Sequence, residues 1–288
     1  MNLYKTVIKP VSTFATPMRG DTLFGQMCWA IRYAFGNSRL KELLSDYESR
    51  PFMIVSDGFA TGYLPKPKLP SVYLDEGKDK KANRKKIWLT ANDLRDGNFA
   101  NGKTAKEVGE DYSFTVMHNS INYQTFKTGD GDFAPYGASE TLLSPKDIYF
   151  LVDNGMFGVN ELIKALEIVS KSGYGKNATI GKGRFEFSDL SEISTEPSKT
   201  VISLSPFVIH GQNYRKCFYE PFTRFGKQGG ERANQNPFKK PILMADTGSV
   251  VTLDETKPYI GKAVKGHASH TDTVHQGYAI AYPIREVV

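Results

Sequence analysis

The sequence predicts an α+β fold of two ferredoxin-like (RRM-like) domains with long loop insertions, the second domain being degenerate. Two observations support this prediction. Strand and helix patterns follow a β-α-β-β-α-β order through the first part of the chain, the order of a ferredoxin-like unit with helices on one face of an antiparallel sheet. The rest shows mainly strand and turn patterns. We therefore expect an N-terminal domain over residues 1–190, with insertions and a glycine-rich loop, and a C-terminal domain over residues 191–288.

The first strand and helices follow from periodicity. Residues 3–9 alternate between polar and apolar side chains, which predicts a strand. Apolar residues over 23–34 recur at helical spacing. Asp21 is placed to cap this helix by accepting bonds from free backbone N–H groups, and Gly36 provides a left-handed stop. A short second helix is expected next, with Ser38 as its cap.

The remaining elements of the first domain lie far apart in the sequence. Apolar runs predict strands over 52–55 and 148–152, and helical spacing predicts a helix over 161–171 that a strand over 184–187 follows. An open sheet face in such a domain suits single-stranded RNA. The second domain is expected to contain strands over 201–204, 207–210, 241–244, 249–253, 259–264 and 277–284.

Two insertions interrupt this order. Residues 77–86 are rich in lysine, and we expect a solvated, flexible loop there. Residues 112–140 form a longer excursion that is rich in asparagine, glycine and aromatic residues. Its aromatic side chains are available to stack on nucleic-acid bases, with packing onto the core as an equal alternative; they are Tyr123, Phe126, Phe133 and Tyr136.

The composition is that of a globular protein with a basic surface. The net charge of +6 is compatible with an RNA or DNA partner. Cys28 and Cys217 are the only cysteines and have no CxxC partner, so neither a zinc site nor a disulfide framework is indicated. No apolar run is long enough for a membrane span or a signal peptide. We expect a cytoplasmic protein with no cofactor and no membrane contact.

A run rich in glycine and lysine over residues 173–187 carries the clearest chemical signal. Its spacing does not fit a Walker loop, and it closes a predicted helix rather than opening one, which excludes a dinucleotide fingerprint. Glycines allow a phosphate backbone to approach closely and let successive N–H groups point at it. Lys176, Lys182 and Arg184 supply positive charge. The alternative is a long flexible turn between a helix and a strand.

A glycine-rich loop after the last helix of a ferredoxin-like domain resembles the hallmark of the RAMP superfamily of CRISPR proteins. The stretch from Thr16 to Ala30, which includes the run Gly20-Asp21-Thr22-Leu23-Phe24-Gly25-Gln26, resembles the first loop and helix of the fourth-subunit family of type III-A (Csm) effector complexes. Further segments are similar to that family, in its order and along nearly the whole chain: 56–58, 64–67, 118–122, 225–231, 237–241 and 275–280.

This resemblance implies a non-catalytic subunit that holds the 5′ repeat-derived tag of a guide RNA. It also implies contacts with the large polymerase-like subunit and the backbone subunit of the Csm complex. His118 and Asn119 would belong to a thumb-like excursion that wedges bases apart, and residues 181–184 would hold tag phosphates. The expected RNA-binding residues are Arg19, Asp21, His118, Asn119, Lys176, Gly181, Lys182, Gly183 and Arg184.

Two other functions stay open. The first is a metal-independent endoribonuclease of the same superfamily that processes CRISPR repeat RNA. In it, His118 would take the proton from a ribose 2′-OH, and Lys127 or Lys176 would stabilise the transition state; a hydrogen-bonded loop histidine is the interpretation we prefer. The second is a general single-strand RNA-binding protein outside CRISPR systems.

Two further patterns are compatible with metal sites, but we prefer a structural role for their residues. His267 and His270 have an HxxH spacing but lie in a predicted loop without a cysteine. Asp21 and Asp57 would share a metal only if folding brought them together. The sequence leaves open the tag sequence, the surfaces that meet each partner and the role of residues 77–86.

Overall fold

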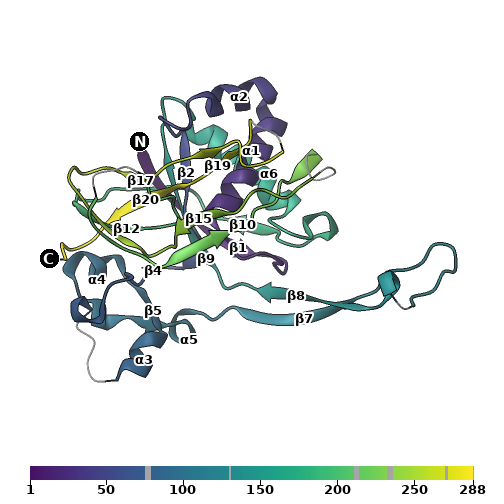
Figure 1. Ribbon diagram of the computed structural model, residues 1–288, viewed down its shortest axis with the longest axis horizontal. Coiled ribbons are helices and arrows are strands. Elements are labelled where there is room, and N and C mark those ends of the chain that lie inside the picture. The colour runs from purple at the N-terminus through teal and green to yellow at the C-terminus, as the bar shows by residue number, and fades with distance from the viewer. Residues whose placement is uncertain (75–78, 130, 211–213, 232–235, 270–271, 288) are drawn as a thin grey trace.

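The computed structural model describes residues 1–74, 79–129, 131–210, 214–231, 236–269 and 272–287. Two antiparallel sheets and the helices packed on them form the body, from which a small α/β insertion and a long hairpin project (Figure 1). None of the described helices is long and apolar enough to cross a membrane.

The first sheet has the strand order β10-β1-β9-β2, with β11 paired to β1 and β3 paired to β9. Helix α1 (Gly20–Phe35) follows β1, and helix α6 (Val159–Ser172) connects β9 to β10, so the predicted order of strands and helices is present. Because β11 pairs with β1, this sheet continues past the expected domain boundary. The strands are β1 (Asn2–Pro10), β2 (Met53–Val55), β3 (Phe59–Ala60), β9 (Lys146–Val152), β10 (Phe185–Phe187) and β11 (Ser191–Ile193).

Two predicted helix caps are wrong. Helix α1 begins at Gly20 with Arg19 as its N-cap residue, so Asp21 lies inside the first turn. Asp21 instead pairs with Arg224 of a distant segment, which local sequence does not reveal. Helix α2 (Asn37–Ser45) follows after the predicted stop at Gly36, whose φ is 88°, and Ser38 lies within that helix.

The second sheet has the strand order β13-β16-β12-β20-β17. No α-helix occurs among the described residues after Ser172. The strand predicted over 207–210 does not form, because Phe207 bonds to Ala245 while the next N–H group bonds to Gly277. The strands of this half are β12 (Thr200–Ser203), β13 (Tyr214–Phe218), β14 (Pro221–Arg224), β15 (Ile242–Ala245), β16 (Val250–Leu253), β17 (Tyr259–Gly261), β18 (Val264–Lys265), β19 (Val274–His275) and β20 (Tyr278–Pro283).

The two sheets share one hydrophobic core. Strand β9 is buried along its whole length, with Tyr149 packed against Tyr282 of the second sheet at a ring separation of 6.4 Å. The buried side chain of Gln276 exchanges two hydrogen bonds with the backbone of Val55, at 2.9 and 2.8 Å. The second half therefore covers the sheet face over β2 and β9 that we expected to be open to RNA.

The insertion holds a three-stranded sheet of order β4-β5-β6. Its helix α3 corrects the loop expected over residues 77–86: the side chain of Asp79 caps the helix by accepting a bond from Ala82 N–H at 3.0 Å. Residues 75–78 lie outside the described part of the chain. The elements are β4 (Leu64–Pro65), β5 (Lys86–Leu89), β6 (Lys103–Thr104), α3 (Lys80–Lys85), α4 (Ala91–Asp96) and α5 (Ala105–Val108).

The excursion over residues 112–140 is a hairpin of two long strands. Strands β7 (Tyr112–His118) and β8 (Tyr136–Leu142) pair along their whole length and project from the body (Figure 1). Short 3-10 turns complete the chain: η1 (Ser71–Tyr73), η2 (Phe99–Asn101), η3 (Gly131–Phe133) and η4 (Ala178–Ile180).

Candidate nucleic-acid interface

The glycine-rich loop folds tightly on itself. A Cβ atom on Gly183 would lie 2.1 Å from the carbonyl oxygen of Tyr174, and one on Gly173 would lie 2.3 Å from that of Lys182. Both glycines have positive φ, as does Gly181, which has open space around it. Gly173 and Gly183 are thus required by packing. Of the predicted loop glycines, Gly181 is the one that an approaching phosphate can reach.

One end of this loop is tied to the base of the hairpin. Glu140 of β8 is 1% exposed and accepts bonds from Lys182 Nζ at 2.7 Å and from the Thr13 hydroxyl at 2.5 Å. The bond from Lys182, with that from Thr13, holds the pKa of Glu140 below its ordinary value. The structure therefore commits the Lys182 ammonium to a carboxylate within the molecule.

His118 lies on the same face of the hairpin. Its Nε2 atom is 3.9 Å from Glu140 Oε1, and its ring stacks on Tyr136 with centroids 5.5 Å apart. Asn119 follows the strand and is exposed. Towards the tip, Tyr123 and Phe126 are 87% and 82% exposed, so these two aromatic side chains face solvent instead of packing on the core.

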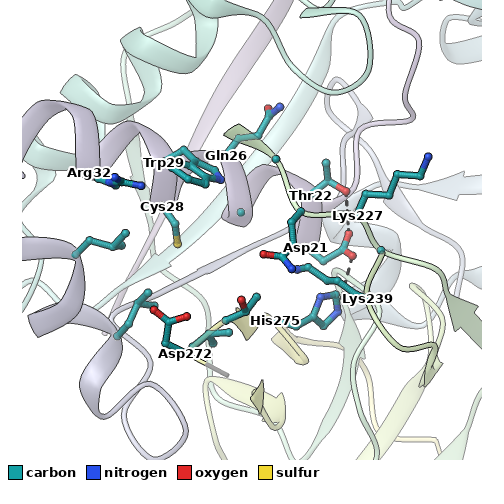
Figure 2. A pocket seen from close by; sticks show the side chains of 18 of the residues that line it. Asp21, Thr22, Gln26, Cys28, Trp29, Arg32, Lys227, Lys239, Asp272 and His275 are labelled. Carbon is teal, nitrogen blue, oxygen red and sulfur yellow. Dashed lines mark hydrogen bonds and ion pairs between the residues drawn. The ribbon is translucent and has the colours of Figure 1, made fainter. Parts of the chain in front are cut away.

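The other end of the loop forms part of the wall of a groove. A cavity of about 850 Å³ lies between α1, α2, the loop residues Gly175 and Lys176, and the segment that follows β14 (Figure 2). Thr16 accepts a bond from the Lys176 N–H at 2.9 Å, which fixes the backbone there. Cationic side chains outnumber the two carboxylates of the lining, Asp21 and Asp272; they are Arg32, Lys41, Lys176, Arg224, Lys227, Lys239 and Lys265.

Asp21 joins α1 to the second half of the chain at the floor of the groove. Its carboxylate pairs with Arg224, and His275 Nε2 lies 3.8 Å away. Burial lowers the pKa of His275 to about 3, so this imidazole is neutral at physiological pH. Burial also lowers the pKa of Lys239 beside it. Figure 2 shows Asp21, Lys239 and His275 converging from three segments.

Several polar atoms of the groove lack a protein partner. Gln26 Oε1, Gln228 Oε1 and His275 Nε2 are buried and accept or donate no hydrogen bond within the described part of the chain. Trp29 on α1 adds an aromatic wall, stacked on Tyr33 at 6.0 Å. Buried polar atoms are usually paired, so these three atoms are exceptions within the groove.

Arg19 lies at the junction between the two halves of the chain, whereas Asp21 lies in the groove. Its guanidinium binds Asp57 at 2.8 Å and Asp246 at 3.3 Å, and so connects the two halves of the chain. Asp57 also accepts bonds from the Gly20 N–H and the Thr247 hydroxyl. Burial raises the pKa of Asp57, and the pairing with Arg19 opposes this effect.

The structure therefore distributes the predicted residues over three places. Asp21 and Lys176 line the groove, Lys182 and His118 lie at the hairpin, and Arg19 lies in the junction between the sheets. The side chain of Arg184 is exposed, while its backbone bonds to the loop after β1. The sequence analysis did not identify most of the groove lining. Residues 226–230 contain glycine and lysine, as the first glycine-rich loop does, and this composition could have indicated that they belong to the same site.

The histidine pattern has no metal-binding geometry in the described residues. His267 contacts His275 edge-on at 5.5 Å, and burial lowers the pKa of His267 to about 4. His270 lies outside the described residues. Within the described chain, no three histidine, cysteine or carboxylate side chains are grouped as metal ligands would be.

Comparisons with known proteins show which solved structures this fold resembles. No known protein family and no curated protein matches the sequence. Solved structures do match: the Csm3-Csm4 subcomplex of the type III-A CRISPR-Cas interference complex gives a TM-score of 0.61 at 14% identity, with 98% of this chain and 100% of that chain covered. The chain therefore has a Csm4-like fold.

Two further structures agree with the Csm4-like fold. The Csm1-Csm4 cassette in complex with AMPPNP gives a TM-score of 0.59 at 16% identity, with 98% of both chains covered. The type III-B Cmr-beta complex bound to cognate target RNA gives a TM-score of 0.50 at 14% identity, with 86% of both chains covered. The family resemblance carried by short sequence segments is confirmed for the fold.

Proposed function

We propose that this chain is a non-catalytic RNA-binding subunit of a type III-A CRISPR effector complex. In this proposal it holds the 5′ repeat-derived tag of the guide RNA in the groove between α1 and the glycine-rich loop. It also bridges the large polymerase-like subunit to the backbone subunit. The observation that carries the proposal is a basic groove with unpartnered polar atoms, walled by that loop, in a Csm4-like fold.

The groove has the chemistry that single-stranded RNA requires. Lys176 and Lys41 stand at its walls, where they can neutralise phosphates. Gln26 and Gln228 offer unpaired amide oxygens, which suit the edges of splayed bases. Trp29 closes one wall of the groove, with its ring against Gly230, Arg32 and Tyr33. We further propose that the second sheet is a degenerate ferredoxin-like domain that has lost its helices.

The partner assignment is supported by the kind of assembly in which similar folds occur. The solved neighbours are a Csm1-Csm4 cassette and a Csm3-Csm4 subcomplex. We extend those two contacts to this chain. Co-expression with the large and backbone subunits tests this: the expected result is a ternary assembly in which each of the two partners requires this chain, and direct assembly without it overturns the bridging role.

The endoribonuclease alternative depends on His118. Its Nε2 atom faces the Glu140 carboxylate, an arrangement that can orient an imidazole for proton transfer. Lys176, one of the two lysines that this alternative would use to stabilise the transition state, lines the groove, whereas His118 lies at the hairpin. We therefore favour a holding role over a cleaving role.

One experiment tests both functions. The purified chain is incubated in chelator with end-labelled repeat RNA and with scrambled RNA of equal length, and binding and cleavage are scored together. Tag-selective binding of intact RNA is expected, weakened several-fold by Lys176→Ala and unchanged by Lys199→Ala on the second half. Equal affinity for both RNAs would indicate a general RNA binder. Cleavage at one position, lost on His118→Ala, would establish the nuclease.

A further inference from the structure

We propose that the insertion carries a second nucleic-acid contact, a basic patch formed by Lys81, Arg84 and Lys85 of α3, which binds the phosphodiester backbone of single-stranded RNA without reading its bases. All three side chains are exposed. Within the described residues, none of them has an ionic partner. The inference goes beyond tag binding in the groove and does not depend on it.

The acidic residues around this patch are already used in local structure. Asp79 caps α3, and Asp93 and Glu107 complete capping boxes at the starts of α4 and α5. Asp96 pairs with its neighbour Arg95 at 3.1 Å. The carboxylates of residues 79–108 therefore do not neutralise α3, and within the described part of the chain its positive charge has no ionic partner.

The charges of α3 do not stabilise the helix as a set. Lys81 is three and four residues from Arg84 and Lys85, so like charges share one helix face, which is unfavourable. Lys81 also lies in the first turn, where the helix dipole disfavours a cation, whereas Arg84 and Lys85 at the last turn are favourable. A polyanion bound across the face would relieve the repulsion among all three.

A fixed platform carries the patch. Leu94 and Phe99 of the insertion belong to the main hydrophobic core. Arg285 near the C-terminus donates its backbone N–H to Leu94 O and its guanidinium to Asp96 O, both at 3.0 Å. Helix α3 packs on β5 and lies at the end of the molecule away from α1 and α2, which wall the groove (Figure 1). The patch and the groove are thus separate surfaces.

The chemistry of the patch favours RNA over a protein partner. Protein interfaces are depleted in lysine and depend on buried aromatic or aliphatic anchors. Ile87 is the exposed apolar side chain closest in sequence to α3 among the described residues, and it is 45% exposed. Lysine and arginine on a short helix without stacking partners match phosphates, which attract through charge alone.

The test compares a triple variant, Lys81→Ala/Arg84→Ala/Lys85→Ala, with a matched control, Lys199→Ala/Lys216→Ala/Lys257→Ala, which removes the same charge from the second half. Binding of labelled single-stranded RNA that lacks the tag is measured by anisotropy over a salt series. We expect the patch variant to bind about tenfold more weakly at low salt, with the salt slope reduced by about 2, since each lost contact removes about 0.7. The control changes affinity less than twofold.

Two further measurements distinguish loss of charge at the patch from misfolding and from loss of tag binding. The variant Lys81→Arg/Lys85→Arg keeps the charge and is expected to bind like the unaltered protein, and thermal melting verifies that all variants fold. RNA of tag length alone should bind the patch variant normally, so failure of tag selectivity and failure of the patch are distinguishable. Equal RNA binding by the patch variant and the control overturns the inference, as does loss of a partner subunit with RNA affinity intact.

Discussion

The two ends of the glycine-rich loop differ in their contacts, although their lysines are only six positions apart. At one end, Lys182 is bound to the buried Glu140 and to Thr13, and Gly183 packs against the backbone of Tyr174. At the other end, the side chain of Lys176 stands at the wall of the groove. The first end anchors the hairpin to the body, and the second places a cation in the groove.

This difference shows that a glycine- and lysine-rich run is not a uniform phosphate-binding element. Its glycines also differ, but not according to the end of the loop: Gly173 and Gly183 would clash with backbone carbonyls if they carried a Cβ atom, whereas Gly181, beside Lys182, would not. Stability and binding are therefore expected to separate residue by residue within the loop.

The largest effect on stability is expected at the anchored end. Gly183→Ala places a Cβ atom 2.1 Å from Tyr174 O at a φ of 72°, and should lower the free energy of unfolding by about 3 kcal/mol or more. Gly181→Ala, at a φ of 90° in open space, should cost only about 1 kcal/mol. Urea denaturation measures both. Equal costs would show that the loop relaxes around either change.

The second-largest effect on stability is expected at the Lys182–Glu140 pair. Lys182→Met leaves a buried carboxylate without its cation and should cost about 2 kcal/mol. Adding Glu140→Gln removes the unpaired charge and should restore part of that loss, which a double-mutant cycle detects as coupling. Strictly additive costs would mean that the two side chains do not support each other in solution.

A smaller, pH-dependent effect should follow from Glu140. Its pKa is lowered in the folded protein, so the pair contributes stability above the ordinary carboxyl pKa of 4.5 and loses it as the pH falls through the folded value. We expect the difference in unfolding free energy between the unaltered protein and Glu140→Gln to shrink on acidification. Unfolding curves at neutral pH and below pH 4.5 measure it; a constant difference would contradict the assignment.

The smallest effect on stability is expected at the groove end. Lys176→Ala should change the free energy of unfolding by less than about 0.5 kcal/mol, because the side chain makes no described ion pair. Its effect on tag RNA should nonetheless be several-fold. If Lys182→Met, checked at a pH where it stays folded, weakened RNA binding more than Lys176→Ala, the division of the loop would be reversed.

Local patterns accounted for much of the fold. The first strand, both long helices and the stop at Gly36 follow from periodicity and glycine conformation, and the structure confirms them. The failures were of two kinds. Asp21 does not cap its helix and instead pairs with Arg224, about two hundred residues away in the chain. Residues 77–86 include a helix that the local residue Asp79 caps, where the lysine-rich composition favoured a loop.

The sequence by itself determined the elements, the basic character and the glycine-rich loop, because these depend on side-chain spacing and backbone freedom over short stretches. Only the tertiary structure decided which cations are free. The sequence alone does not distinguish Lys176 from Lys182. In the folded chain, Glu140 of the hairpin strand β8 pairs with Lys182. The second sheet likewise covers the face that a lone ferredoxin-like unit would expose, since burying apolar area on β9 stabilises the fold. The open surface between the two halves is thereby the groove.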